Sequence, residues 1–190
     1  MLKSPETGGK TSGPKKEDKL KKYPNLTETK EKYSDGPLRQ ATLCFPVKDG
    51  EVLLAMKRRG FAAGKWNGAG GKVSPEDKNI RAAAVRETFE EILITPRKLK
   101  KVAVLNFYFQ GEDEWNQRVT VFLTGSWSGE PGETEEMSPK WFDLDKIPYD
   151  TMWDDDKLWP PKVLSGKIVE GDFLFDEDQK MLEYDIREIA

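Results

Sequence analysis

The stretch Arg86-Glu87-Thr88-Phe89-Glu90-Glu91-Ile92 decides the interpretation of this chain, because it carries three carboxylates within five positions. On a helix, Glu87, Glu90 and Glu91 are i, i+3 and i+4 neighbours, so their side chains lie on one face. Each like-charge pair at this spacing costs roughly 0.2–0.5 kcal/mol unless a cation neutralises the cluster. Taken alone, the pattern is more typical of a solvated helix face, and a metal site is the alternative.

Two neighbouring features shift the interpretation towards a metal site. A glycine turn at Gly70-Gly71 precedes the helix at a distance that can bring a backbone carbonyl to the same cation. Arg86 lies four residues before Glu90 and can orient its carboxylate by an ion pair. Because hard oxygen ligands suit Mg²⁺ or, as a substitute, Mn²⁺, we expect one of these ions. The expected ligands are Glu87, Glu90, Glu91 and the Gly70 carbonyl.

The composition of the chain excludes several functions. With 190 residues, of which 36% are hydrophobic, it can form one domain with an ordinary core. A net charge of −3 argues against nucleic-acid binding, so a phosphate-bearing ligand should need a metal cation. The sequence has no histidine, which leaves carboxylates, lysine, tyrosine or metal-bound water for proton transfer. The single cysteine, Cys44, excludes an intramolecular disulfide.

Neither a membrane span nor a signal peptide is evident in the sequence. No apolar run approaches the ~18–20 residues needed to cross a bilayer, and the N-terminus lacks a hydrophobic signal region. We therefore expect a cytoplasmic protein that does not bind membranes. The sequence does not fix the oligomeric state, for which a monomer is favoured. Residues 1–36 contain nine lysines and six acidic residues but few apolar ones, which predicts a disordered, Lys-rich tail before a single domain at 37–190.

Residue patterns along the folded part predict both helices and strands. Two strand-like runs at 41–47 and 51–56 flank Asp49-Gly50, which predicts a β-hairpin. Ser74-Pro75 is typical of a helix start with Ser74 as N-cap, and Pro96 should end that helix. A helical region is expected at 151–165, and further strand-like runs lie at 100–110, 117–126, 168–175 and 181–187. This arrangement predicts an α/β or α+β sandwich.

The glycine turn and the carboxylate helix together resemble the signature of the Nudix hydrolases. That signature is Gly, five residues, Glu, seven residues, Arg-Glu, an aliphatic residue, any residue, Glu-Glu, any residue, Gly and an aliphatic residue. The matching positions are Gly71, Arg86, Glu87, Glu90, Glu91 and Ile94. Because the spacing is one residue longer, the first Glu is replaced by Asp77, counting forward, or Lys78, counting back. Thr88 stands at the aliphatic position, and Leu93 replaces the final Gly.

The resemblance covers nearly all of 39–189 and implies an α/β/α sandwich with a mixed central sheet. Trp66-Asn67-Gly68 and Trp153-Asp154-Asp155-Asp156 are similar to a MutT-like branch of the family that hydrolyses oxidised purine nucleoside triphosphates. Glu136 aligns with a loop carboxylate that approaches the metal in that branch. The implied substrate-binding residues are Thr42, Lys57, Phe61, Asn67, Trp153, Asp155, Asp156 and Trp159. An insertion around 115–117 prevents the transfer of any site residue there.

The resemblance implies a site for the purine base of the nucleotide, and the residue types at that site suit a purine. Asn67 offers donors and an acceptor to a purine edge, although a simple turn residue is the alternative. If Asp155 and Asp156 enter a pocket, repulsion and desolvation should raise one pKa and leave a neutral carboxyl that donates a hydrogen bond. Otherwise they form a solvated acidic loop. Phe107 and Phe109 align with further aromatic residues that can stack on the base in that branch. For these two, packing in the core is the favoured interpretation.

The resemblance implies hydrolysis to the monophosphate and pyrophosphate, which would cleanse the nucleotide pool. The first expected substrate is 8-oxo-dGTP, and 2-hydroxy-dATP is the second. The implied catalytic residues are Arg86, Glu87, Glu90 and Glu91, with either Glu90 or Glu91 as the base. One alternative is a Nudix hydrolase of another modified nucleotide, such as a methylated purine triphosphate. Another is a nucleotide-binding module without catalysis.

Overall fold

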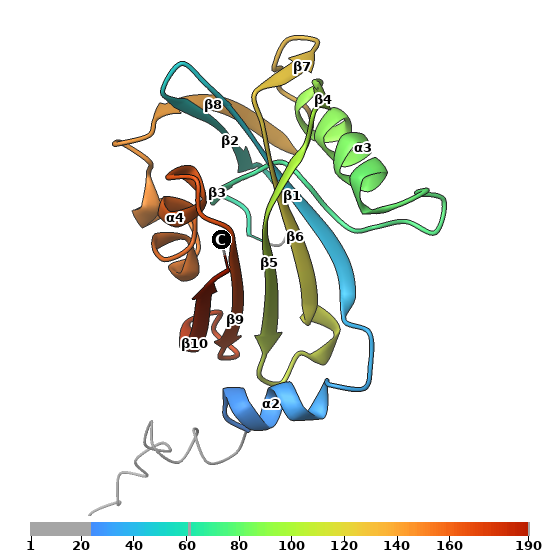
Figure 1. Ribbon diagram of the computed structural model, residues 1–190, viewed down its shortest axis with the longest axis vertical. Helices are drawn as coiled ribbons and strands as arrows, with labels where there is room; N and C mark the ends of the chain where they lie inside the picture. Colours follow the sequence, from blue (N-terminus) through green and yellow to red (C-terminus); the bar gives the residue numbers. More distant parts are fainter. Residues whose placement is uncertain (1–23, 61, 190) are drawn as a thin grey trace, which may run out of the picture.

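The computed structural model describes residues 24–60 and 62–189, which form a sheet flanked by helices (Figure 1). The helices are α2 (Leu26–Lys32), α3 (Ile80–Ile92) and α4 (Pro160–Leu164). The strands are β1 (Arg39–Lys48), β2 (Glu51–Lys57), β3 (Trp66–Asn67), β4 (Thr95–Arg97), β5 (Lys100–Phe109), β6 (Gln117–Thr124), β7 (Ser126–Ser128), β8 (Met137–Asp143), β9 (Val169–Phe175) and β10 (Met181–Glu188). Within the described part, no helix is long and apolar enough to cross a membrane.

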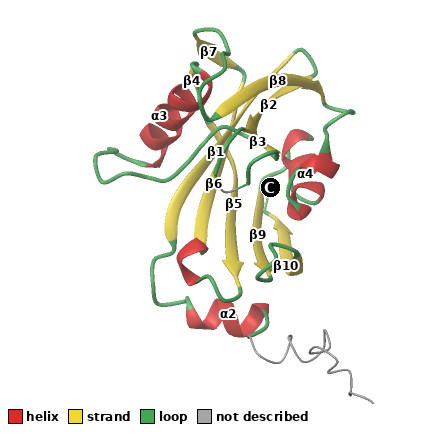
Figure 2. Cartoon of the chain, turned by 180° about the vertical axis from the view of Figure 1, so that it is seen from behind, coloured by secondary structure: helices red, strands yellow, loops and turns green. Residues whose placement is uncertain are grey.

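The main sheet is mixed, in the order β10-β9-β5-β6-β1-β2-β3, with β8 also paired to β2. The pairs β1–β6 and β5–β9 are parallel, and the remaining neighbours are antiparallel. Helices α3 and α4 lie on different sides of the sheet (Figures 1 and 2). Ile92 of α3 and Val163 of α4 accordingly belong to separate apolar clusters. The predicted α/β sandwich with a mixed central sheet is confirmed.

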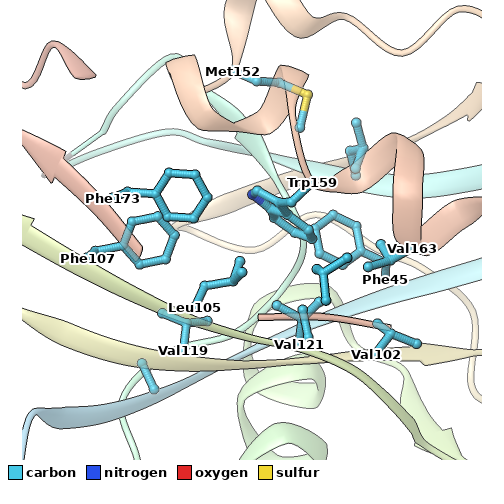
Figure 3. Packing of buried hydrophobic residues seen from close by; sticks show 14 of the residues in the cluster. Phe45, Val102, Leu105, Phe107, Val119, Val121, Met152, Trp159, Val163 and Phe173 are labelled. Carbon is cyan, nitrogen blue, oxygen red and sulfur yellow. The ribbon is translucent and has the colours of Figure 1, made fainter. Parts of the chain in front are cut away.

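The larger apolar cluster joins α4 to the sheet. Figure 3 shows the rings of Phe107 and Phe173 against each other, with centroids 5.3 Å apart, and Trp159 beside Phe45. The Phe45 and Trp159 rings meet edge to face at 5.7 Å. Trp159 is fully buried, so the start of α4 is held against the sheet by one large side chain.

The expected hairpin is present as β1 and β2. Val47 pairs with Val52 and Lys48 with Glu51, which leaves Asp49-Gly50 as a two-residue turn. Both turn residues have positive φ, 54° and 83°, as the favoured hairpin turn requires. The local residue pattern was therefore sufficient to locate this hairpin.

The expected bounds of the carboxylate helix are wrong at both ends. Helix α3 begins at Ile80, and Asn79 is its N-cap, with the Asn79 Oδ1 accepting hydrogen bonds from two backbone N–H groups at 3.0 Å. Ser74 lies in the preceding loop, where its N–H donates to Asp77. At the other end, Leu93 turns into the left-handed region at φ 64°, and Pro96 lies in β4. The helix therefore ends where the Nudix signature has Gly, the residue that takes this conformation without strain.

The expected tail also needs correction. Residues 1–23 lie outside the described residues, but 24–36 contain helix α2, which begins with a capping box between Asn25 and Glu28. Leu26 packs on Tyr108 and Leu174, on the face of the sheet away from Phe107. Averaging the composition over 36 residues concealed this short segment, which gains its stability from tertiary packing.

Helix α2 is anchored by an ion pair to a buried acid. Lys30 Nζ lies 2.7 Å from Asp172 Oδ2, and the Asp172 side chain is 5% exposed. The other oxygen of Asp172 accepts a hydrogen bond from Asn106 at 2.8 Å, and Asn106 in turn accepts from Arg118 at 2.9 Å. A polar chain thus crosses β6, β5 and β9 and ends on α2.

Replacing Lys30 by Met should lower the free energy of unfolding by about 2 kcal/mol, because it leaves the Asp172 carboxylate buried without its cation. Lys32→Met is the matched control, since the Lys32–Asp113 pair is exposed and should contribute less than about 1 kcal/mol. Urea unfolding of both variants measures the difference. Equal losses in the two variants would contradict the anchoring role of Lys30.

Candidate active site

The glycine turn lies against β1, where backbone hydrogen bonds hold it, and on its other side it contacts helix α3. Cys44 and Ala69 exchange backbone hydrogen bonds of 2.7 and 3.1 Å, and Thr42 N–H donates to the Gly71 carbonyl at 2.8 Å. A Cβ at Gly70 would collide with the Thr42 carbonyl, and one at Gly71 would collide with the Glu87 carboxylate. Close approach therefore requires glycine at position 70, where the obstacle is backbone, whereas at position 71 the obstacle is the movable end of the Glu87 side chain.

Glu91 is the buried carboxylate of the helix. One of its oxygens accepts a hydrogen bond from Gly70 N–H at 2.8 Å, and the other lies 3.9 Å from Lys57 Nζ. Burial raises the pKa of Glu91 to about 7, and the charges of Glu87 and Glu136 add to the rise, while Gly70 and Lys57 oppose it. The group is thus poised to change charge near neutral pH.

Arg86 gathers the other acidic residues of the helix. Its Nη1 donates to Glu87 at 2.7 Å and to Glu90 at 3.0 Å. Its Nε and Nη2 donate to the two oxygens of Asp77 at 3.1 and 2.8 Å, which holds the pKa of Asp77 below its usual value. The structure therefore assigns the first acidic position of the signature to Asp77 and not to Lys78.

Glu136 lies at the edge of the same group. It accepts from Lys57 at 3.3 Å and from Arg59 at 3.1 Å, and these cations lower its pKa. Lys57 thereby bridges the loop carboxylate and Glu91. Glu136 is thus linked to Glu91 through Lys57, and its approach to a metal stays a prediction.

The predicted metal ligands are close to one another but are not yet arranged as a coordination shell. Among residues 24–60 and 62–189, no three acidic or cysteine side chains converge in that way, because Arg86 engages Glu87 and Glu90. The donor types nevertheless fit a divalent cation: all are hard oxygens, and burial leaves Glu91 with only a distant lysine as counter-charge. The Gly70 carbonyl has no hydrogen bond to any described residue.

A cleft of about 200 Å³ extends from this group over the sheet. The predicted site residues that line it are Thr42, Lys57, Asn67, Gly70, Glu91, Trp153, Asp155, Asp156 and Trp159. Thr42 is 1% exposed, and its hydroxyl has no hydrogen-bond partner among the described residues. Phe61 lies outside the described residues. The structure thus brings together residues that are more than 100 positions apart in the sequence.

Asp155 and Asp156 lie in a 3₁₀ turn, Asp154–Lys157, and both are almost fully buried. Asp155 accepts from Trp159 Nε1 at 2.9 Å, and Asp156 accepts from the Trp153 N–H at 3.0 Å. Burial raises the pKa of Asp155 to about 6, and burial plus the charge of Asp155 raises the pKa of Asp156 well above its usual value. The solvated-loop alternative is therefore wrong, and burial favours the neutral form of both carboxyls.

The other predicted positions have mixed surroundings. Asn67 Oδ1 accepts from Gly68 N–H at 2.7 Å, so the residue shapes its turn and lines the cleft as well. Trp159 packs in the core and presents only part of its surface to the cleft. Phe107 and Phe109, for which core packing was expected, are buried and also line the cleft.

Sequence reasoning missed several residues that line the cleft, among them Phe175, Lys65 and Gln117. Phe175 stacks on Phe109 with ring centroids 5.1 Å apart, and Lys65 Nζ lies 5.1 Å from the Trp153 ring while donating to the Met152 carbonyl at 3.0 Å. Gln117 lines the cleft from the start of β6. The alternation of strand residues could have indicated Phe175, but no local pattern marks the other two.

Residues 37–163 match the family model of the NUDIX domain. This chain belongs to the Nudix family. Its members use divalent metal ions and act on small nucleotide substrates. A zebrafish (Danio rerio) protein named oxidized purine nucleoside triphosphate hydrolase is 45% identical over 148 residues, covering 78% of this chain and 94% of that protein. The mouse (Mus musculus) protein of the same name is 42% identical, covering 80% of this chain and 96% of that protein.

Solved Nudix structures agree with the fold. A mutator MutT protein from Bacillus halodurans superposes with a TM-score of 0.69 at 25% identity, over 78% of this chain and 97% of that chain. A MutT Nudix hydrolase from Burkholderia pseudomallei gives a TM-score of 0.54 at 30% identity, over 58% of this chain and 86% of that chain. Helix α2 precedes the segment that matches the family model.

Replacing Asp156 by Asn should change the pH dependence of stability. The pKa of Asp156 is raised in the native state above its ordinary value of 3.8. Between these two pKa values the native state binds more protons than the unfolded state, so this group lowers the free energy of unfolding as pH rises. The variant should therefore be more stable than the parent protein at pH 8, with a difference that shrinks towards pH 4. Denaturant unfolding across this range measures it. Asp150→Asn is the control, because the Asp150 side chain is 97% exposed and its removal should have little effect on the profile. A profile of Asp156→Asn parallel to that of the parent protein would contradict the burial argument.

Proposed function

We propose that this protein hydrolyses oxidised purine nucleoside triphosphates to the monophosphate and pyrophosphate, and so cleanses the nucleotide pool. The observation that carries the proposal is the buried Asp155–Asp156 pair, in a cleft that also contains the Glu91 carboxylate. The names of the zebrafish and mouse relatives, which match over nearly their whole length, support the same activity. The net charge of −3 favours free nucleotides over nucleic acid, and we propose a monomer.

The carboxylate end of the cleft fits the polyphosphate. We assign Glu87, Glu91 and the Gly70 carbonyl to Mg²⁺, with Glu90 and Glu136 at its border. When bound, such a cation neutralises phosphate charge and polarises the scissile bond. Lys57, held between Glu91 and Glu136, adds a positive charge on the same side.

Two carboxylates are candidates for the base that activates water. Glu90 is half exposed and paired with Arg86. Glu91 is buried, and its carboxylate faces Gly70 N–H and Lys57. A cation bound at Glu91 would lower its pKa and take up its oxygens, so Glu90 and Glu91 both stay candidates, and Arg86 is assigned to positioning Glu87 and Glu90.

The other end of the cleft fits an oxidised base. A carboxyl pair that shares a proton can donate at one oxygen and accept at another, and the assignment can reverse with the ligand. Asn67 and the ring of Trp153 complete the polar and stacking contacts. This adaptability would allow 8-oxo-dGTP as first substrate and 2-hydroxy-dATP as second.

A nucleotide panel tests the activity. With Mg²⁺, we expect pyrophosphate release from 8-oxo-dGTP at a kcat/KM at least tenfold above that for dGTP. Assaying pyrophosphate against orthophosphate identifies the bond that is cleaved. Preference for a methylated purine triphosphate would instead favour the other modified-nucleotide hydrolase, and binding without turnover would favour a non-catalytic module. Turnover of ordinary nucleotides alone would remove the cleansing role.

Replacing Glu91 by Gln tests the catalytic assignment. The variant keeps an oxygen for Gly70 N–H but loses the charge, so kcat should fall at least about a hundredfold while the nucleotide still binds. Steady-state kinetics and nucleotide titration separate the two effects. Glu135→Gln is the control, because this loop carboxylate is 85% exposed and should not affect kcat. Full activity of Glu91→Gln would overturn the assignment.

A further inference from the structure

Gln117 is a polar residue of the cleft wall to which the proposed reaction gives no role. It is the first residue of β6, and successive residues of a strand point to opposite faces. Val119 and Val121 point into the cluster around Trp159, as Figure 3 shows, whereas Arg118 reaches Asn106 on the other face. Gln117 shares the face of the two valines, and it lines the cleft.

The surroundings of Gln117 on this face are apolar. Its cross-strand neighbour on β5 is Phe107, and Phe109, Val119 and Phe175 line the same part of the sheet. Its side-chain amide makes no hydrogen bond with any residue of the described ranges. An amide in such a place either keeps water or receives a partner from the ligand, because covering it without a partner is unfavourable.

The register of the sheet places Gln117 away from the phosphate end of the cleft. On β1 its partner is Arg39, three residues before Thr42, which is bonded to the glycine turn next to Glu91. Three strand residues correspond to roughly 10 Å. A triphosphate held at Glu91 therefore leaves the nucleoside, not the phosphates, within reach of Gln117.

From this placement we propose that Gln117 is a specificity-determining residue, whose amide hydrogen-bonds a polar group on the base or sugar of the bound nucleoside. The inference rests on the proposed function for the identity of that nucleoside. A site with an amide in an apolar wall selects strongly, since a ligand without the matching group leaves the amide unpaired. Gln117 would thereby separate nucleotides that the carboxylate pair accepts equally.

Two variants of similar length test the proposal. Gln117→Met removes both donor and acceptor, and Gln117→Glu removes the donor alone. Binding of nucleoside monophosphates, measured by calorimetry without divalent cation, gives a readout that does not depend on hydrolysis. The panel contains 8-oxo-dGMP, 8-oxo-GMP, dGMP and dAMP, so that base and sugar contacts are distinguished. Thr120→Val is the control, because Thr120 is a polar residue of the same strand on the opposite face.

Gln117→Met should weaken the best-bound monophosphate about fivefold to tenfold, the loss expected for one neutral hydrogen bond. Monophosphates that lack the contacted group should change less than twofold. A loss that differs between bases identifies a base contact, and one that differs between ribose and deoxyribose identifies a sugar contact. Equal changes across the panel, or none, would overturn the proposal. If hydrolysis of oxidised nucleotides fails but selective binding losses persist, only the proposed function is refuted.

Discussion

The hydrogen bond from the Gly70 amide to the buried Glu91 carboxylate is the interaction on which the site depends. It joins the glycine turn to the helix that carries the remaining acidic residues. The turn itself is attached to the sheet by backbone hydrogen bonds to Cys44 and Thr42. The turn can approach because Gly70 has no side chain to collide with the Thr42 carbonyl. Burying a carboxylate is unfavourable, and the fold retains it because the same group fixes turn and helix together.

Departures from the family signature are compensated by geometry. One additional residue precedes helix α3, and Asp77 still reaches Arg86 with both oxygens from its loop. Leu93 takes the left-handed conformation that the signature normally gives to Gly, at a strain of about 1–2 kcal/mol. Between these two changes, Glu87 still pairs with Arg86 and Glu91 still accepts from Gly70 N–H.

Local patterns predicted the elements whose signals lie within a few residues. The Asp49-Gly50 hairpin and the carboxylate face needed only neighbouring positions. The helix start was misplaced because Ser74 carries the same local signal as Asn79, and the choice between them depends on Asp77 being held by Arg86. Features that depend on tertiary contacts could not be predicted from local patterns. These are the burial of the aspartate pair, the packing of α2, and the side of β6 that faces the cleft. The resemblance to the MutT-like branch supplied site residues only where this sequence could be aligned with that branch.

The ion pair between Lys30 and Asp172 has a practical consequence for protein production. Family boundaries begin at residue 37, and a shortened protein cut there would discard α2 while keeping the acid that α2 neutralises. It would also uncover Tyr108 and Leu174, two apolar side chains at one end of the sheet. A protein shortened to the family limits would thus expose an apolar surface beside an unpaired acid, whereas one that begins at residue 24 keeps α2 with its ion pair.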